Sequence, residues 1–281
     1  GLGDVYKRQP PGSSFKIITA AAALEQQIRS PEDAVEAPVS VPLPGSRARI
    51  SNIESTSCGD GHPTFTYAFA YSCNTPFAKI GQDLGYQALK DKTEAFGFNP
   101  KTDLKIPLPV QKSYFPSSDP GIASTMMSAI GQYEVRTSPL MMATVAGAVA
   151  NQGTQARPFL VAAELGSDGK ATRTYRSGGK LGKPISKEVA SQLRQMMIQT
   201  VNDGTGEPGR VAGVEMGAKT GTAQTGGHKT DAWYVGWADT PNLPLAFAVV
   251  VEGDSSNPAP HGGPIAGPIA KQVIQAAMNH D

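Results

Sequence analysis

The segment PPGSSFKIITAAAALE, residues 10–25, constrains the fold more than any other part of the sequence. Its second half, IITAAAAL, is apolar on every side, and a helix of that kind lies buried in the centre of a domain. A Pro-Gly turn precedes it and Ser13 stands at the capping position, which predicts a central helix over residues 14–27. Lys16 places a charged amine one turn inside this buried helix, and its presence there needs a chemical reason.

The spacing of Ser13 and Lys16 offers such a reason. Side chains three residues apart on a helix lie on the same face. A serine hydroxyl becomes a good nucleophile when a neighbouring base takes its proton, and lysine can be that base only when it is neutral. Apolar burial and the positive end of the helix both favour the neutral amine. The pair therefore fits an activated nucleophile. Ser-x-x-Lys alone is weak evidence, because it occurs by chance in most long chains and by itself favours a capping serine and a surface lysine.

The chain changes from helical to strand-like patterns along its length. Helical segments are expected between residues 64 and 203, and three strand-like runs with a final helix are expected over 211–281. Helices followed by an antiparallel meander predict an α+β fold in which the sheet packs against a helical cluster. Residues 1–9 fit no element and are expected to form a non-native or unstructured tail. Residues 10–281 are expected to form one domain, with the helical part inserted between the nucleophile helix and the sheet.

The composition excludes several classes of protein. Hydrophobic residues make up 39% of the 281 residues and charged residues only 17%, which favours a packed core over disorder. The net charge of +1 gives no electrostatic attraction to nucleic acid or to an anionic membrane. No apolar run approaches the roughly 18 residues that a membrane-spanning helix needs.

Two further motifs follow the Ser-x-x-Lys pair in the chain. Ser72-Cys73-Asn74 stands at a predicted break between helices, and Lys-Thr-Gly-Thr at 219–222 lies in a strand-like run. The combination of Ser-x-x-Lys, a Ser-x-Asn-type element and Lys-Thr-Gly is the signature of penicillin-binding proteins and related β-lactamases. All three motifs occur here in the expected order and in the expected structural contexts.

The similarity extends beyond these motifs. The segments PPGSSFKIITAAAALE, SCNTPFAKIG, VNDGTG, AKTGTAQT and DAWYVGWAD resemble the transpeptidase domain of class B penicillin-binding proteins, from about residue 10 to the end of the chain. The resemblance implies the penicillin-binding protein/serine β-lactamase-like fold. Because that fold starts with strands upstream of the nucleophile, we expect an N-terminally truncated piece that lacks these strands. The last strand, near residues 245–252, would then present an unpaired edge.

The resemblance also implies roles for the first two motifs. Ser13 would be the acylated nucleophile and Lys16 the base that deprotonates it. Ser72 would relay a proton toward the leaving amine. Asn74 would hold the substrate amide and help to fix Lys16.

The third motif would bind the substrate. Lys219 would keep the cleft positive and support the proton relay, and Thr220 and Thr222 would hydrogen-bond the terminal carboxylate of the substrate. The backbone N–H groups of Ser13 and Thr222 would form the oxyanion hole. Gly221 would leave room for substrate lying along the strand.

The reaction that the resemblance implies is peptidoglycan cross-linking without a cofactor. The donor would be the D-Ala-D-Ala end of a stem peptide, the acceptor an amine of a neighbouring stem peptide, and β-lactams would acylate Ser13 in place of the donor. The expected location is the extracytoplasmic face of the bacterial cytoplasmic membrane, with other cell-wall synthesis proteins as partners. No metal site is expected, because the histidines show no metal-ligand spacing.

Alternative functions of the same site remain open. A D,D-carboxypeptidase or a β-lactamase-type hydrolase would use the same acyl-serine, and a β-lactam sensor or an inactive piece would not turn over. Class A β-lactamases carry a Glu-x-x-x-Asn element before Lys-Thr-Gly, and no glutamate between Asn74 and Lys219 has an asparagine four residues later. This absence counts against that hydrolase.

Smaller features add three expectations. Cys58 and Cys73 either form a disulfide, which would contribute about 3 kcal/mol by loop closure, or remain two reduced thiols. Trp233 and Trp237 fall on one face of their strand and are expected in the core. Tyr133 stands where the family resemblance predicts a glycine.

Overall fold

The structure, a computed structural model, describes residues 8–100, 106, 110–175, 179–226, 229–241 and 243–279. The helices are α1 (Lys16–Glu25), α2 (Phe65–Ala70), α3 (Asn74–Ala95), α4 (Ile122–Ala129), α5 (Pro139–Ala150), α6 (Lys187–Asp203) and α7 (Gly267–Met278). The strands are β1 (Ser40–Pro42), β2 (Arg49–Ser51), β3 (Gln155–Ala156), β4 (Ala163–Leu165), β5 (Ala171–Thr174), β6 (Lys180–Gly182), β7 (Glu215–Gly226), β8 (Lys229–Asp239) and β9 (Leu245–Glu252).

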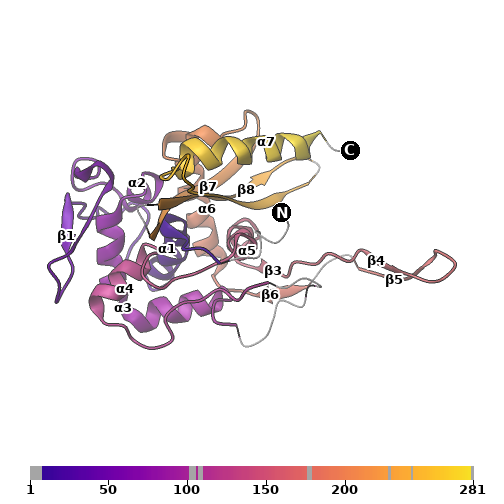
Figure 1. The fold of residues 1–281 in the computed structure, drawn as a ribbon, viewed down its shortest axis with the longest axis horizontal. Helices are drawn as coiled ribbons and strands as arrows, with labels where there is room; N and C mark the ends of the chain where they lie inside the picture. Colours follow the sequence, from indigo (N-terminus) through magenta and orange to yellow (C-terminus); the bar gives the residue numbers. More distant parts are fainter. Residues whose placement is uncertain are drawn as a thin grey trace.

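The main sheet is antiparallel in the order β7-β8-β9, and helices cover both of its faces. Helices α5 and α6 pack on one face and α7 on the other (Figure 1). Within the described residues β9 pairs only with β8, so it forms an edge of the sheet. This arrangement is the α+β fold expected from the sequence.

The strand β8 separates two apolar clusters because its side chains alternate. Trp233, Val235 and Trp237 are fully buried in the cluster that contains α1, α5 and α6. Tyr234 on the opposite face belongs to the cluster with Ile274 of α7. The core position predicted for the two tryptophans is confirmed.

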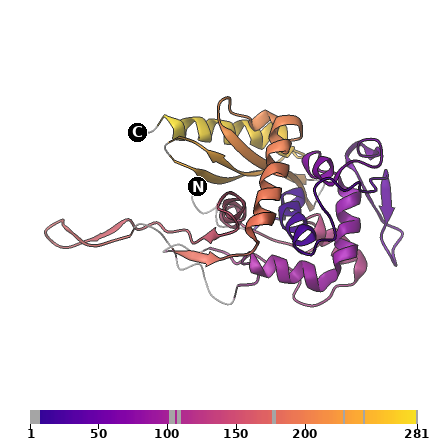
Figure 2. The ribbon, with the colours of Figure 1, turned by 180° about the vertical axis from the view of Figure 1, so that it is seen from behind.

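Helix α1 lies in the middle of the helical layer, between α3 and α6 (Figure 2). Its residues 16–24 are all buried, as the apolar composition predicts. It ends at Glu25 because Gln27 adopts a left-handed φ of 55°. The Ile28 N–H then donates to the Ala23 carbonyl and the Gln27 N–H to the Leu24 carbonyl, which is the Schellman ending of a helix.

The predicted start of this helix was wrong in detail. Ser13 lies inside a 3-10 turn, Gly12–Phe15, and α1 begins only at Lys16. The residue that precedes the turn is Pro11, which makes no side-chain capping hydrogen bond. Ser13 is therefore not a cap, and its hydroxyl remains available for other chemistry.

The helical part predicted for residues 64–203 also contains strands. Strands β3 and β6 pair with each other, and β4 and β5 form a hairpin that projects from the body of the fold (Figures 1 and 2). The turn of this hairpin contains Asp168-Gly169, with Gly169 at a φ of 75°. An Asp-Gly pair between short strand-like runs is a hairpin signal, so the sequence did carry this information.

The N-terminal boundary also differs from the prediction. Gln9, assigned to the tail of residues 1–9, forms an antiparallel bridge with Thr137 through hydrogen bonds of 2.7 and 2.9 Å. It therefore belongs to the folded domain. Residues 1–7 of that tail lie outside the described residues.

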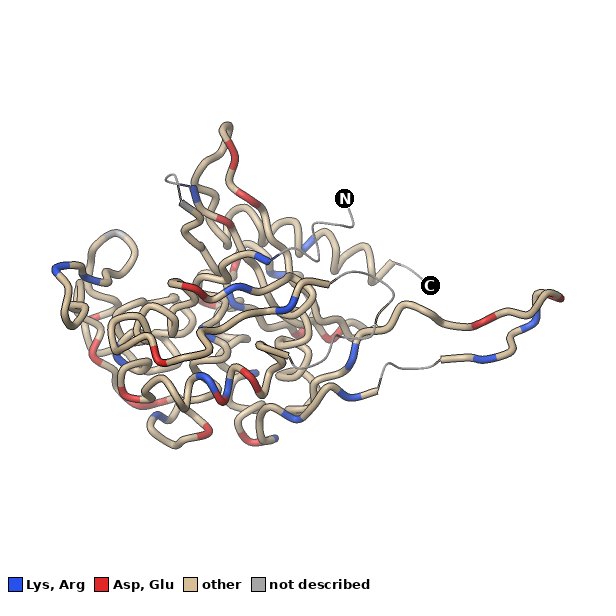
Figure 3. The backbone as a smooth tube through the Cα atoms, turned by 60° about the horizontal axis from the view of Figure 1, so that its bottom comes forward, with Lys and Arg blue, Asp and Glu red and all other residues tan. Residues whose placement is uncertain are grey.

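Positions of both charge signs are interspersed along the described backbone, including the projecting hairpin of β4 and β5 (Figure 3). Across the described ranges, no helix combines the length and apolarity required to cross a membrane.

Candidate active site

A turn held by two glycines presents Ser13. Gly12 and Gly131 both have left-handed φ angles, 51° and 75°, and the Gly12 N–H donates to the Gly131 carbonyl over 3.0 Å. A Cβ atom added to Gly131 would lie 2.0 Å from the Gly12 oxygen, so only glycine allows this approach. The buried Ser14 hydroxyl fixes the same turn by donating to the Pro11 carbonyl. Ser13 is the partly exposed member and lines the cleft.

Lys16 is fully buried directly beneath this turn. Its Nζ donates to the Ser72 carbonyl and to Asn74 Oδ1, both over 2.8 Å, and lies 5.4 Å from the centre of the Phe77 ring. No carboxylate of the described chain forms an ion pair with it. Burial first, and then the charge of Lys219, hold the pKa of Lys16 well below its usual range.

The structure differs from the simplest form of the sequence prediction in one respect. The hydrogen bonds of the described residues include none between Ser13 and Lys16. The amine of Lys16 instead donates to the Ser72 carbonyl and to Asn74 Oδ1. The motif predicts side chains on one side of the helix start, but it does not specify which atoms the lysine contacts.

The backbone conformation of Ser72 is determined by the C-terminal end of α2. Ser72 has a left-handed φ of 61° and follows α2. Its N–H donates to the Phe69 carbonyl and the Cys73 N–H to the Ala68 carbonyl, again the Schellman pattern. The Ser72 carbonyl, which this ending leaves free, accepts from Lys16.

A disulfide joins the next residue of this motif to the loop after β2. Cys58 and Cys73 are bonded, with Cα atoms 6.0 Å apart. Of the two states that the sequence left open, the structure has the oxidised one.

The strand β7 carries the Lys-Thr-Gly motif along the opposite wall. Lys219 is fully buried, and its Nζ donates to the Thr220 carbonyl over 3.0 Å and lies 5.6 Å from the Phe69 ring centre. Burial lowers the pKa of Lys219 to about 7. The Thr220 hydroxyl is 2.5 Å from that of Thr205, a residue of the VNDGTG segment to which the sequence analysis gave no role.

The reason for Gly221 differs from the one predicted. A Cβ atom there would lie 2.9 Å from the Pro11 oxygen and 3.0 Å from the Ser14 nitrogen. A side chain at this position would therefore collide with the turn that carries Ser13. Gly221 allows the strand and the turn to touch, and space for substrate is not what requires it.

One cleft of about 820 Å³ brings these elements together. Six of the predicted site residues line it: Ser13, Ser72, Asn74, Thr220, Gly221 and Thr222. Lys16 and Lys219 lie beneath its floor. The sequence analysis gave no role to four further lining residues: Arg49, Gln132, Thr205 and His261. The resemblance of the VNDGTG segment was a signal for Thr205, whereas the other three lie outside the three motifs.

The lining suits an anionic ligand. It contains Arg49 but no aspartate or glutamate among its described residues. Two buried lysines, which form no ion pair with any described residue, lie next to it. Ile53, Met127 and Ile130 add an apolar wall. A carboxylate would gain favourable contacts in such a cleft without competition from protein anions.

Tyr133 sits in the turn next to Gln132 with a φ of 59°. Non-glycine residues adopt this left-handed region uncommonly, which explains why a glycine was expected. Its carbonyl accepts a hydrogen bond from Arg136 Nη1 over 3.0 Å. The departure concerns the backbone of this turn and leaves the site residues in place.

The free energy of unfolding is expected to rise with pH between about 7 and 10. Lys219 has a folded pKa of about 7, whereas a lysine in an unfolded chain titrates near ~10.4. Between these values the unfolded chain binds more protons, so higher pH favours the folded state by about 1.4 kcal/mol per pH unit. The lowered pKa of Lys16 acts in the same direction. Urea unfolding across this range measures the slope, which Lys219→Met should reduce; a flat or falling curve would contradict the burial of neutral amines.

No group of His, Cys, Asp and Glu side chains in the described part of the chain could hold a metal ion. The chemistry of the site therefore has to be argued from its hydroxyl, amine and amide groups.

Comparisons with known proteins agree with this geometry. Residues 3–275 match the family described as penicillin binding protein transpeptidase domain. The chain is 37% identical to the peptidoglycan D,D-transpeptidase PbpA of Mycolicibacterium smegmatis and 36% identical to PbpA of Mycobacterium tuberculosis, over 98% of this chain and 56% of each relative. The stage V sporulation protein D of Bacillus subtilis is 28% identical over 98% of this chain and 43% of its own length.

Solved structures give the same result. The crystal structure of PBPA from Mycobacterium tuberculosis aligns with a TM-score of 0.87 and 34% identity, covering 98% of this chain and 62% of that chain. An imipenem acyl-enzyme complex of penicillin-binding protein A from the same organism aligns with a TM-score of 0.86. The chain thus spans little more than half the length of the two PbpA relatives.

Proposed function

Because the chain belongs to the class B penicillin-binding protein transpeptidases, we propose that it is a serine D,D-transpeptidase that cross-links peptidoglycan stem peptides. The observation that carries the proposal is the environment of Lys16. A neutral amine has two N–H groups and one lone pair, and Ser72 O and Asn74 Oδ1 accept from both N–H groups. The lone pair is then left for the proton of Ser13.

Acylation would proceed from this arrangement. Ser13 Oγ attacks the carbonyl of the penultimate D-alanine while its proton passes to Lys16 Nζ. The backbone N–H groups of Ser13 and Thr222 stabilise the oxyanion. As the C–N bond breaks, the proton reaches the leaving D-alanine amine through the Ser72 hydroxyl. The products are an acyl-serine and free D-alanine.

Substrate binding would use the opposite wall. The hydroxyls of Thr220 and Thr222 hydrogen-bond the terminal carboxylate, and the nearby Lys219 adds positive charge. Asn74 holds the substrate amide with its remaining hydrogen-bonding capacity, since its Nδ2 already donates to the Ser51 carbonyl. The cleft without lining carboxylates supports this anionic donor.

The second half of the reaction distinguishes a transpeptidase from a hydrolase. Resolution by an amine of a second stem peptide yields the cross-link, and resolution by water yields a free acid. A hydrolase benefits from a carboxylate base that activates water. The described lining offers none, which favours the amine as acceptor.

The same residues would react with β-lactams and work outside the cytoplasm. A β-lactam would acylate Ser13 by the same attack and, lacking a diffusible leaving group, would stay attached. The disulfide between Cys58 and Cys73 is typical of oxidising compartments. We place the protein at the extracytoplasmic face of the bacterial cytoplasmic membrane, as one transpeptidase domain that works with other cell-wall synthesis proteins.

Labelling with a fluorescent penicillin tests the function. The wild-type protein should acquire one covalent label at Ser13 that persists for hours, and Ser13→Ala should acquire none while unfolding at the same urea concentration. Rapid release of the label would identify a hydrolase. A folded wild-type protein that never becomes labelled would be an inert relative, and the proposal would be wrong.

A further inference from the structure

The helix that carries Asn74 is capped by a residue from a distant segment. The first N–H groups of a helix have no partner within it. The residue before α3, Cys73, makes no side-chain capping hydrogen bond. Instead Asn52 Oδ1 accepts from the N–H groups of both Asn74 and Thr75, over 2.9 and 3.0 Å.

The side chain of Asn52 is buried and fully hydrogen-bonded. Only 8% of its surface is exposed. Its Nδ2 donates to the carbonyls of Pro38 and Thr56 over 2.9 and 3.2 Å, and its backbone N–H donates to Val39. Each polar atom of this side chain has a partner, so the amide has one orientation, and its oxygen faces α3.

This cap acts on the atoms that contact the catalytic lysine. Asn74 Oδ1 accepts from Lys16, and Asn74 Nδ2 donates to the carbonyl of Ser51, the residue before Asn52. The segment 51–52 therefore fixes both the backbone and the side chain of Asn74. Without it, Asn74 would be free to turn away from Lys16.

We propose that Asn52 is a positioning residue of the active site. It acts through Asn74 to keep one N–H of Lys16 engaged, so that the amine lone pair points toward Ser13. The proposal rests on the proposed function, because it assigns Asn52 to the same acylation step.

Two substitutions separate this role from general stabilisation. Asn52→Leu removes the acceptor, and since a misplacement of about 1 Å can cost about 100-fold in rate, the acylation rate should fall by about 10- to 100-fold at every pH. Asn52→Asp keeps an acceptor oxygen at the start of α3 and adds a negative charge near Lys16. Its second oxygen replaces the amide group that donates to the Pro38 and Thr56 carbonyls, so the free energy of unfolding should fall. An anion favours the protonated amine, so the acidic limb of the acylation–pH profile should move to higher pH. The rate at the alkaline plateau of the folded variant should stay within about threefold of wild type, because the acceptor for the Asn74 and Thr75 N–H groups is kept.

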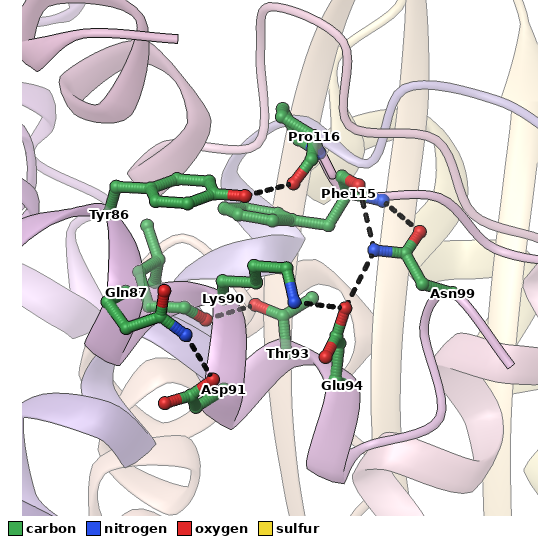
Figure 4. Close-up of polar contacts among 10 residues, drawn as sticks. Tyr86, Gln87, Lys90, Asp91, Thr93, Glu94, Asn99, Phe115 and Pro116 are labelled. Carbon is green, nitrogen blue, oxygen red and sulfur yellow. Dashed lines mark hydrogen bonds and ion pairs between the residues drawn. The ribbon is translucent and has the colours of Figure 1, made fainter. Parts of the chain in front are cut away.

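Asn99 provides a matched control at the other end of the same helix (Figure 4). Its side chain also joins backbone groups, since Oδ1 accepts from the Phe115 N–H and Nδ2 donates to the Phe115 carbonyl. Asn99→Leu should lower stability and leave acylation within about threefold. Asn99→Asp should leave the pH profile unmoved, because its charge lies at the far end of α3 and the field of a distant charge is screened.

Two measurements test whether Asn52 positions the active site: the rate of penicillin acylation as a function of pH, and urea unfolding of each variant. Folded Asn52→Leu that reacts at the wild-type rate would overturn the proposal, as would equal losses in Asn52→Leu and Asn99→Leu. If Asn52→Leu does not fold, Asn52→Asp decides: an alkaline plateau near the wild-type rate with a shifted limb supports the role, and any other profile contradicts it.

Hydrogen exchange tests the cap on α3 independently of whether the protein is acylated. If the wild-type protein is not acylated at all, the proposed function fails and the assignment of Asn52 to acylation falls with it. Hydrogen exchange at the amides of Asn74 and Thr75 then still tests the cap. Both amides should be protected in wild type and in Asn52→Asp and exchange faster in Asn52→Leu; unchanged exchange would show that Asn52 does not cap α3.

Discussion

Replacing Lys16 with methionine is expected to lower the rate of Ser13 acylation by penicillin by about 10²- to 10⁴-fold, the usual contribution of a general base. Methionine has a similar length and an apolar character, so it suits the fully buried position beside Phe77. The substitution removes a buried amine, which favours folding, but leaves Ser72 O and Asn74 Oδ1 without a donor, at a cost of about 1–3 kcal/mol. The protein should therefore remain folded and fail in the chemical step.

Lys92 supplies the control for this substitution. It also extends a partly buried side chain whose Nζ donates to a carbonyl, that of Pro184, and burial lowers the pKa of Lys92 as well. Lys92→Met should label at the wild-type rate. The measurement is the time course of labelling with fluorescent penicillin, with urea unfolding in parallel. Wild-type labelling by a folded Lys16→Met would remove Lys16 from the mechanism.

The second large effect is expected at Gly131. Gly131→Ala places a Cβ 2.0 Å from the Gly12 oxygen and 2.8 Å from the Phe15 Cβ, at a left-handed φ. The backbone strain costs about 1–2 kcal/mol and the collision a further ~1–3 kcal/mol. Relief of the collision requires the turn that carries Ser13 to move, so labelling should also fall, by at least about 10-fold.

Gly121→Ala separates strain from collision. Gly121 also has a positive φ, 83°, but a Cβ there would meet nothing within 4 Å. It should lower the free energy of unfolding by the strain alone and leave labelling unchanged. Equal labelling rates in the two folded alanine variants would show that the contact between Gly12 and Gly131 does not position the nucleophile.

The sequence predicted best what depends on short motifs and on strand alternation. Ser72, Asn74 and residues 220–222 line the cleft with Ser13, and Trp233 and Trp237 lie in the core. The position of the tryptophans follows from strand alternation, because periodicity determines which side of an element is buried. The site residues were expected from the three motifs and the family resemblance that they carry.

The sequence could not predict what depends on contacts between remote segments. Asn52 carries no motif, and only the fold brings it to the start of α3. The same holds for Gly221, whose neighbour is the Ser13 turn and not the substrate. Ser13 in a 3-10 turn instead of a cap also follows from this packing, since Gly12 and Gly131 shape the turn from both sides.

The two buried lysines have a consequence for the order of events in the cleft. Burial lowers the pKa of Lys219 to about 7, and the charge of Lys219 lowers the pKa of Lys16. A carboxylate bound at Thr220 and Thr222 would favour protonation of Lys219. The charge on Lys219 would then reinforce the neutral state that burial already favours in Lys16, so binding of an anionic substrate would help to keep the base ready.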